Sequence, residues 1–116
     1  MRIGCLSFDF IGGLRLRVTG KDNVSTKEQL TNFGFALLEQ MNVDTMPKDW
    51  EEAFRLLQKA IENMPEGAKV IFFDELPWFD TRSSHFISVL EHFWNDWAFY
   101  RNDIKLITCG SATTWM

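Results

Sequence analysis

Hydrophobic and polar residues alternate strictly near the start of the chain. Between residues 14 and 18, leucine and valine occupy every second position and arginines stand between them. This period of two predicts a half-buried β-strand. The apolar segment at 3–11 predicts a further strand before it. Gly12-Gly13 between the two segments fits a two-residue hairpin turn, because glycine tolerates the positive φ angles that such a turn needs.

The pattern then changes to the helical period for two long segments. Ser25 and Glu28 fit a capping box at the start of a helix over 25–41. Its apolar stripe at helical spacing is formed by Leu30, Phe33, Leu37 and Met41. Asp49 can cap a second helix over 49–64, which has the most regular apolar stripe in the chain and is followed by a proline and a glycine.

Two short apolar runs without alternation follow, at 69–73 and 104–109. Unbroken runs of this kind are typical of strands covered on both faces in a parallel sheet. A helix of about 82–99 is predicted between them, and Asp80 or Thr81 can cap it. The order strand, helix, helix, strand, helix, strand predicts an α/β fold whose parallel strands are joined by right-handed crossovers.

Three polar residues stand at the predicted carboxyl ends of these strands. Asp74 and Glu75 follow one strand directly, and Ser111 follows the other. Ligands of open parallel sheets bind beyond that edge. The first carboxylate can hold a hydrated Mg²⁺, and the second can orient or deprotonate a water that attacks a γ-phosphate. Two structural alternatives remain open: the acids simply end a strand in solvent, and Ser111 caps a following helix.

The two segments that contain these residues are distinctive. The first is Val-Ile-Phe-Phe-Asp-Glu-Leu-Pro-Trp at 70–78, and the second is Leu-Ile-Thr-Cys-Gly-Ser-Ala-Thr-Thr-Trp-Met at 106–116. Together they resemble a family of prokaryotic AAA+-like P-loop ATPases, in which the first segment is the Walker B strand and the second carries the sensor 1 position. The resemblance covers about residues 18–116, with weaker matches at Thr19-Gly20 and at 29–33.

The resemblance implies a partial three-layer α/β/α sheet of the P-loop NTPase type, with about three parallel strands plus the N-terminal strand or hairpin. It also implies ATP and Mg²⁺ as cofactors. Asp74 would be the acid associated with Mg²⁺ and the nucleotide, and Glu75 would be the catalytic base. Ser111 would be the sensor 1 hydroxyl that contacts the γ-phosphate or the attacking water.

The phosphate-binding loop of that family does not occur in the sequence. Its pattern is Gly-x-x-x-x-Gly-Lys-Ser/Thr, whereas the Gly-Lys pair of this chain, Gly20-Lys21, has Arg15 five positions before the glycine. Residues 1–17 stand where the family has the loop and its strand. We therefore expect a single ATPase core domain at 1–116, cut at both ends, with an atypical segment at 1–17 and no useful ATP hydrolysis by itself.

A second interpretation belongs to a different functional class. The chain could be a non-catalytic interaction module derived from a degenerate ATPase domain. Such a module would bind a partner protein or a second copy of the chain through an exposed sheet edge and exposed aromatic side chains. A phosphate-binding loop encoded just upstream of Met1 would favour the ATPase interpretation over the module.

Composition and charge agree with one folded domain and exclude several classes of protein. Of the 116 residues, 46% are hydrophobic and 24% are charged, which excludes a disordered chain. The net charge of −4 gives no support to nucleic-acid binding. Two cysteines are too few for a disulfide scaffold, and no apolar run approaches the roughly 20 residues of a membrane span. The N-terminus makes a poor signal peptide, so we expect a cytoplasmic protein.

Two further groups of residues are interpreted as structural. His85 and His92 lie seven residues apart, too far for a shared metal ion on one helix, so we expect solvated polar positions. An aromatic cluster could stack on single-stranded nucleic acid, but the basic groove that such a platform needs is lacking, so we favour core packing with a part left exposed for self-association. The cluster consists of Trp78, Phe79, Trp94, Trp97, Phe99, Tyr100 and Trp115.

Overall fold

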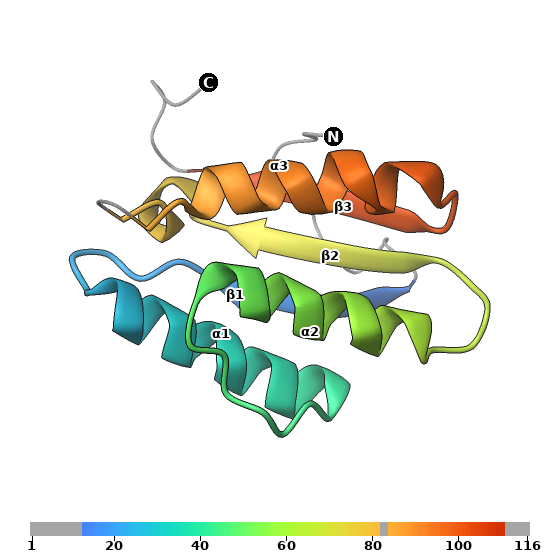
Figure 1. Ribbon diagram of the computed structural model, residues 1–116, viewed down its shortest axis with the longest axis horizontal. Coiled ribbons are helices and arrows are strands. Elements are labelled where there is room, and N and C mark those ends of the chain that lie inside the picture. Colours follow the sequence, from blue (N-terminus) through green and yellow to red (C-terminus); the bar gives the residue numbers. More distant parts are fainter. Residues whose placement is uncertain (1–12, 82–83, 111–116) are drawn as a thin grey trace.

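The computed structural model describes residues 13–81 and 84–110. These residues form a parallel sheet with helices packed on it (Figure 1). The α/β class and the order of strands and helices are confirmed for this part of the chain, whereas the strand expected at 3–11 lies outside it. In chain order the elements are β1 (Leu14–Thr19), α1 (Thr26–Met41), α2 (Trp50–Glu62), β2 (Lys69–Asp74), the 3₁₀ helix η2 (Leu76–Phe79), α3 (Phe86–Asp96), the 3₁₀ helix η3 (Ala98–Tyr100) and β3 (Ile104–Cys109).

The central strand of the sheet is β2, in the order β1-β2-β3. Both neighbours run parallel to it, with Thr19 of β1 and Cys109 of β3 in register with Asp74. Parallel neighbours need crossover connections, which α1 and α2 provide between β1 and β2, and α3 provides between β2 and β3. The three expected parallel strands are therefore present, and their carboxyl ends meet at one edge with Asp74 in the middle.

All three α-helices pack on the same face of the sheet (Figure 1). The centre of this face is aromatic, because Phe33 of α1 and Phe54 of α2 lie 6.1 and 6.0 Å from the ring of Phe73 on β2. The opposite face presents Val70 and Phe72, which are also buried. The described residues thus form two layers, and a third layer of helices, as expected for a complete P-loop sheet, is not among them.

Side chains of α1 close the outer edge of β1. The amide of Gln40 accepts from the backbone N–H of Arg17 and donates to its carbonyl, both at 2.7 Å. Asn32 donates to the carbonyl oxygen of Thr19 at 2.9 Å. These amides occupy backbone groups that an additional strand would otherwise pair with.

The first two helices begin at the residues expected from the sequence. The hydroxyl of Ser25 accepts from the backbone N–H of Glu28 at 3.2 Å, and the carboxylate of Asp49 accepts from Glu52 at 2.7 Å. Each cap satisfies an amide that has no partner inside the first turn of its helix.

The third helix is shorter than predicted and begins later. The expected helix is present, but its predicted start at about 82 and its cap at Asp80 or Thr81 are wrong, because α3 begins at Phe86 and His85 precedes it in a left-handed conformation (φ 61°). The Thr81 hydroxyl pairs instead with the hydroxyl of Thr26 on α1. The hydroxyl of Ser84 accepts from the first helical amide at 3.3 Å.

Candidate functional site

Asp74 ends the central strand with its carboxylate partly open to solvent. One oxygen, Oδ1, accepts from the backbone N–H of Glu75 at 2.9 Å. The other, Oδ2, lies 3.8 Å from a guanidinium nitrogen of Arg17 on the neighbouring strand, and the side chain of Asp74 is 26% exposed. The carboxylate is thus oriented by these two contacts while part of the side chain stays in solvent.

Glu75 adopts an unusual backbone conformation at the carboxyl edge. Its φ of 55° and ψ of 48° lie in the left-handed region, where residues other than glycine are disfavoured. From there the chain turns sharply into η2, and the backbone N–H of Trp78 donates to the Glu75 carbonyl at 3.1 Å. Strained residues of this kind are concentrated at functional sites, where the surrounding structure holds them.

Gly20 packs directly against this strained segment. Its N–H donates to the carbonyl oxygen of Asp74 at 2.9 Å. A methyl group at Gly20 would lie 2.6 Å from the carbonyl oxygen of Glu75 and 3.0 Å from the ring of Phe79. The β1–α1 connection therefore approaches the carboxylate segment so closely that only glycine fits.

Gln29 is a further residue of the site, and it was not predicted from the sequence. Its side chain is fully buried on α1. The amide nitrogen donates to the carbonyl oxygens of Lys21 and Trp78, the latter at 2.9 Å, and the amide oxygen accepts from the Lys21 N–H at 3.1 Å. The signal was its spacing: Gln29 lies one helical turn before Phe33, so a polar residue occupies the buried stripe.

Ser111, the third predicted site residue, lies outside the described residues. The preceding Gly110 is described, and a methyl group there would lie 3.1 Å from the ring of Pro77 in η2. Cys109, in register with Asp74, is disulfide-bonded and offers no free thiol at this edge. The end of β3 is thus packed against the segment that follows Glu75.

The acids at this edge fit a hydrated magnesium ion better than a protein-enclosed one. Within residues 13–81 and 84–110, no group of three or more histidine, cysteine, aspartate or glutamate side chains could enclose a metal. Mg²⁺ commonly takes one or two carboxylates and completes its octahedron with water or phosphate oxygens. The partly exposed carboxylate of Asp74 fits that limited role.

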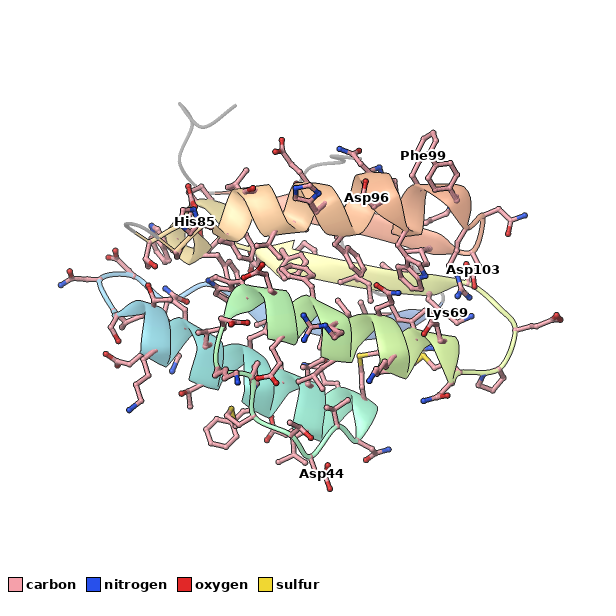
Figure 2. All side chains as sticks on the ribbon, in the orientation of Figure 1. Asp44, Lys69, His85, Asp96, Phe99 and Asp103 are labelled. Carbon is pink, nitrogen blue, oxygen red and sulfur yellow. The ribbon has the colours of Figure 1, made fainter. Side chains whose placement is uncertain are left out.

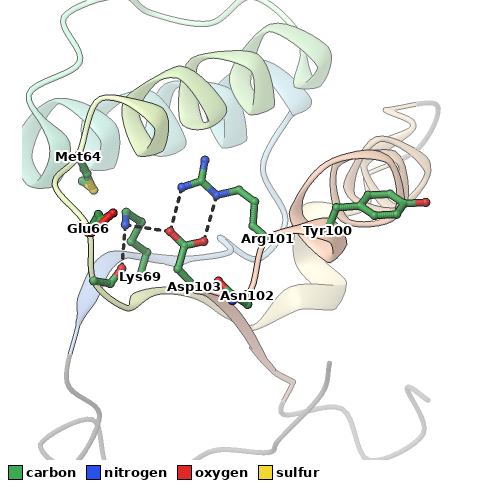
Figure 3. A pocket seen from close by; sticks show the side chains of 8 residues that line it. Met64, Glu66, Lys69, Tyr100, Arg101, Asn102 and Asp103 are labelled. Carbon is green, nitrogen blue, oxygen red and sulfur yellow. Dashed lines mark hydrogen bonds and ion pairs between the residues drawn. The ribbon is translucent and has the colours of Figure 1, made fainter.

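A pocket lies at the opposite end of the sheet, where β2 and β3 begin. It has a volume of about 480 Å³ and is lined by residues that include Lys69, Arg101 and Asp103 (Figure 3). The buried ammonium of Lys69 donates to Asp103 at 3.0 Å and to the Gly67 carbonyl at 2.7 Å. Arg101 donates to both oxygens of Asp103, at 3.0 and 2.9 Å. These charged groups bind one another, so we interpret the cluster as structural.

The pairing in this cluster shifts the pKa values of two of its members. Hydrogen bonds from Arg101, and then from Lys69, hold the pKa of Asp103 well below its usual range, although desolvation opposes the shift. The hydrogen bond to Asp103 in turn raises the pKa of Arg101. Both shifts favour the charged forms, which agrees with a permanent ion-pair network.

The two histidines are not brought together. His85 and Asp96 lie at opposite ends of α3 (Figure 2). The imidazole of His92 faces Asp96 at 3.1 Å in an exposed pair. Both histidines are exposed, so the expectation of solvated positions is confirmed.

The aromatic cluster does not form one platform. Phe79 is buried in the core, whereas Phe99 and Tyr100 are 62% and 78% exposed at the far end of α3. Trp78 is 37% exposed, in η2 near the carboxyl edge. Trp115 lies outside the described residues. The exposure of each ring depends on its place in the fold. Phe79 packs against Phe73 of β2, whereas the two rings of η3 are exposed to solvent.

Comparisons with other proteins do not identify the family. No family model, curated protein or solved structure gives a significant match to this chain. Among the described residues, no helix combines the length and apolar character needed to cross a membrane.

Proposed function

We propose that this chain contributes the acidic residues of the Mg-ATP site of an AAA+-like P-loop ATPase domain in the cytoplasm. The observation that carries the proposal is the position of Asp74 and Glu75 together at the carboxyl end of the central parallel strand. Ligands of open α/β sheets bind at this edge, and the strained backbone of Glu75 supports a functional role for it.

The proposed roles follow from the geometry of each carboxylate. Bound Mg²⁺ would neutralise charge on the phosphates of ATP. Asp74, fixed through its Oδ1, would present Oδ2 to that ion or to a water bound to it. Glu75 would accept the proton of the attacking water as general base. Ser111, two residues beyond the end of β3, would donate its hydroxyl to the γ-phosphate or the water.

The backbone amides of a phosphate-binding nest must come from residues other than Gly20 and Lys21. The backbone N–H of Lys21 donates to Gln29, and that of Gly20 donates to Asp74. Both amides are therefore engaged and cannot contribute to a nest around a phosphate. We expect the 116-residue chain alone to bind Mg-ATP more weakly than micromolar and to show no turnover.

The alternative proposal is a non-catalytic interaction module. It is supported by the exposed pair Phe99 and Tyr100, whose ring centroids lie 5.4 Å apart in an edge-to-face arrangement. The covered edge of β1 disfavours self-association through that strand. A partner of this module would accordingly contact the far end of α3 rather than the β1 edge of the sheet.

A metal titration of the chain as it exists tests the leading proposal. Mn²⁺, which shares the octahedral oxygen preference of Mg²⁺, should selectively broaden the amide NMR signals around Asp74 and Glu75. Asp74→Asn should abolish that broadening, whereas the matched surface change Asp96→Asn should leave it intact. Broadening elsewhere only would reject this edge as a metal site.

Nucleotide chemistry is tested separately. Isothermal titration calorimetry of the chain with Mg-ATP should show no micromolar binding. A micromolar affinity would show that the chain binds the nucleotide without the phosphate-binding loop. In a longer chain that includes a phosphate-binding loop, Glu75→Gln should abolish turnover and leave ATP binding largely intact, because the base is lost while the phosphate contacts remain. Unchanged turnover would remove Glu75 from the mechanism.

A further inference from the structure

The left-handed backbone of Glu75 needs an explanation outside its own segment. Glutamate gains nothing from this conformation by itself, and such strain persists only where the surrounding structure determines the backbone. Its neighbours in sequence contribute hydrogen bonds at both backbone groups, since the Glu75 N–H donates to Oδ1 of Asp74 and the Trp78 N–H donates to the Glu75 carbonyl. Contacts from another part of the chain also constrain the ends of this segment.

The β1–α1 connection and α1 supply that constraint. Gly20 fixes Asp74 from one side through its N–H, and it leaves no space for the Glu75 carbonyl to move toward it. Gln29 fixes the other end of the turn, since its amide nitrogen donates to the Trp78 carbonyl. The same amide group binds both backbone groups of Lys21, so Gly20 is held in place as well.

We propose that Gln29 is a positioning residue for Glu75. Its buried amide joins the β1–α1 connection to η2 and thereby keeps Glu75 in the left-handed conformation at the end of β2. The functional meaning of this clamp rests on the proposed function, whereas the clamp itself is a property of the chain alone. Through one side chain, Gln29 hydrogen-bonds backbone atoms of both segments.

A buried amide is well suited to this task. It has two donors and one acceptor group in a plane, and three of its hydrogen bonds go to backbone atoms. An apolar side chain of the same length would leave the Lys21 and Trp78 carbonyls without these partners. The turn would then be free to relax toward ordinary backbone angles.

Amide hydrogen exchange in Gln29→Met and Gln40→Met tests the clamp. Both changes replace an α1 glutamine that bonds to backbone atoms near β1, but Gln40 bonds to Arg17, away from the turn. In Gln29→Met, exchange of the Trp78 and Gly20 amides should rise about tenfold. In Gln40→Met, both amides should exchange as in the unmodified chain. Equal effects of the two variants would overturn the proposal.

Repeating the Gln29→Met change in a Glu75→Gly variant tests whether the effect of Gln29 depends on Glu75. Glycine at position 75 removes the strain, so in Glu75→Gly the effect of Gln29→Met on the Trp78 amide should shrink to about threefold or less. An undiminished effect would make Gln29 a general stabilising residue and overturn the proposal. If Gln29→Met does not fold, Glu75→Gly alone still tests the proposal. This variant should slow exchange of the Trp78 amide severalfold. Unchanged exchange of that amide would contradict the proposal.

The exchange results and the metal titration fail independently. Exchange is measured without metal or nucleotide, so it tests the clamp whatever the chain binds. If Mn²⁺ broadening is absent from Asp74 and Glu75 in the unmodified chain, the proposed function fails while the clamp stands. If broadening is present there, Gln29→Met should weaken it at both residues, because the Asp74 carboxylate is held by the backbone N–H of Glu75.

Discussion

Arg17 and Asp74 form an ion pair across adjacent parallel strands, with Nη2 of the arginine 3.8 Å from Oδ2 of the aspartate. The guanidinium also lies over the ring of Phe72, 5.7 Å from its centroid. A positive charge is thus placed beside the oxygen to which we assign the magnesium ion. Because like charges repel, Arg17 should weaken the binding of a divalent cation there.

The first prediction concerns this ion pair. Arg17→Gln should raise the Mn²⁺ affinity of Asp74 about threefold at low salt, an effect of the size expected for an exposed pair. Arg15→Gln removes an exposed charge from the same strand and should change the affinity less. Mn²⁺ titrations followed by NMR measure both affinities. Equal affinities in Arg17→Gln and the unmodified chain would show that the arginine does not oppose the cation.

The second prediction concerns the ion-pair network at the amino ends of β2 and β3. Asp103→Asn should lower the free energy of unfolding by about 2 kcal/mol at neutral pH, because the buried Lys69 loses its counter-charge. Urea denaturation followed by tryptophan fluorescence measures the loss. The matched change Asp96→Asn, in an exposed pair, should cost far less.

The third prediction follows from the sign of the Asp103 pKa shift. Its folded-state pKa is depressed, so its stabilising contribution is fully present above the unfolded-state pKa of about 4. The contribution is lost as the pH falls below that value toward the folded-state pKa. Urea midpoints between pH 5 and pH 2 should therefore fall more steeply in the unmodified chain than in Asp103→Asn. Parallel profiles would contradict the assignment.

The fourth prediction concerns strain at Glu75. Glu75→Gly should raise the free energy of unfolding by about 1 kcal/mol, because glycine adopts the left-handed backbone without a steric penalty. Thermal unfolding measures the gain. Glu66→Gly, at a loop position outside the left-handed region, should give no gain. Removal of the proposed base would at the same time abolish catalysis in a complete ATPase, which is the usual trade-off between stability and function.

The fifth prediction concerns the edge of β1. Replacing Asn32 and Gln40 together by alanine exposes the backbone groups of Arg17 and Thr19 to other strands. The double variant should form concentration-dependent dimers or larger species in size-exclusion chromatography with light scattering. Glu39→Ala, on the exposed side of the same helix, is the control and should elute like the unmodified chain.

Elements with a regular hydrophobic pattern were predictable from local sequence. The alternation at 14–18 and the unbroken run at 104–109 correspond closely to β1 and β3, because side-chain period and burial set strand identity. The start of α3 was not predictable, since Thr81 was a sound cap by residue type but its hydroxyl binds Thr26, fifty-five positions away in the chain. Such a contact exists only once the elements have packed.

Residue type and spacing along the chain were enough to predict the three strands, the helices between them, the parallel order and the carboxylate pair after β2. What surrounds that pair depends on how the elements pack against one another. The left-handed Glu75, the close approach of Gly20 and the ion pair with Arg17 all arise between different elements. Gln29 shows the difference most clearly: as one polar residue in an apolar stripe it has no evident role, until packing places its amide between two backbone segments that must be held together.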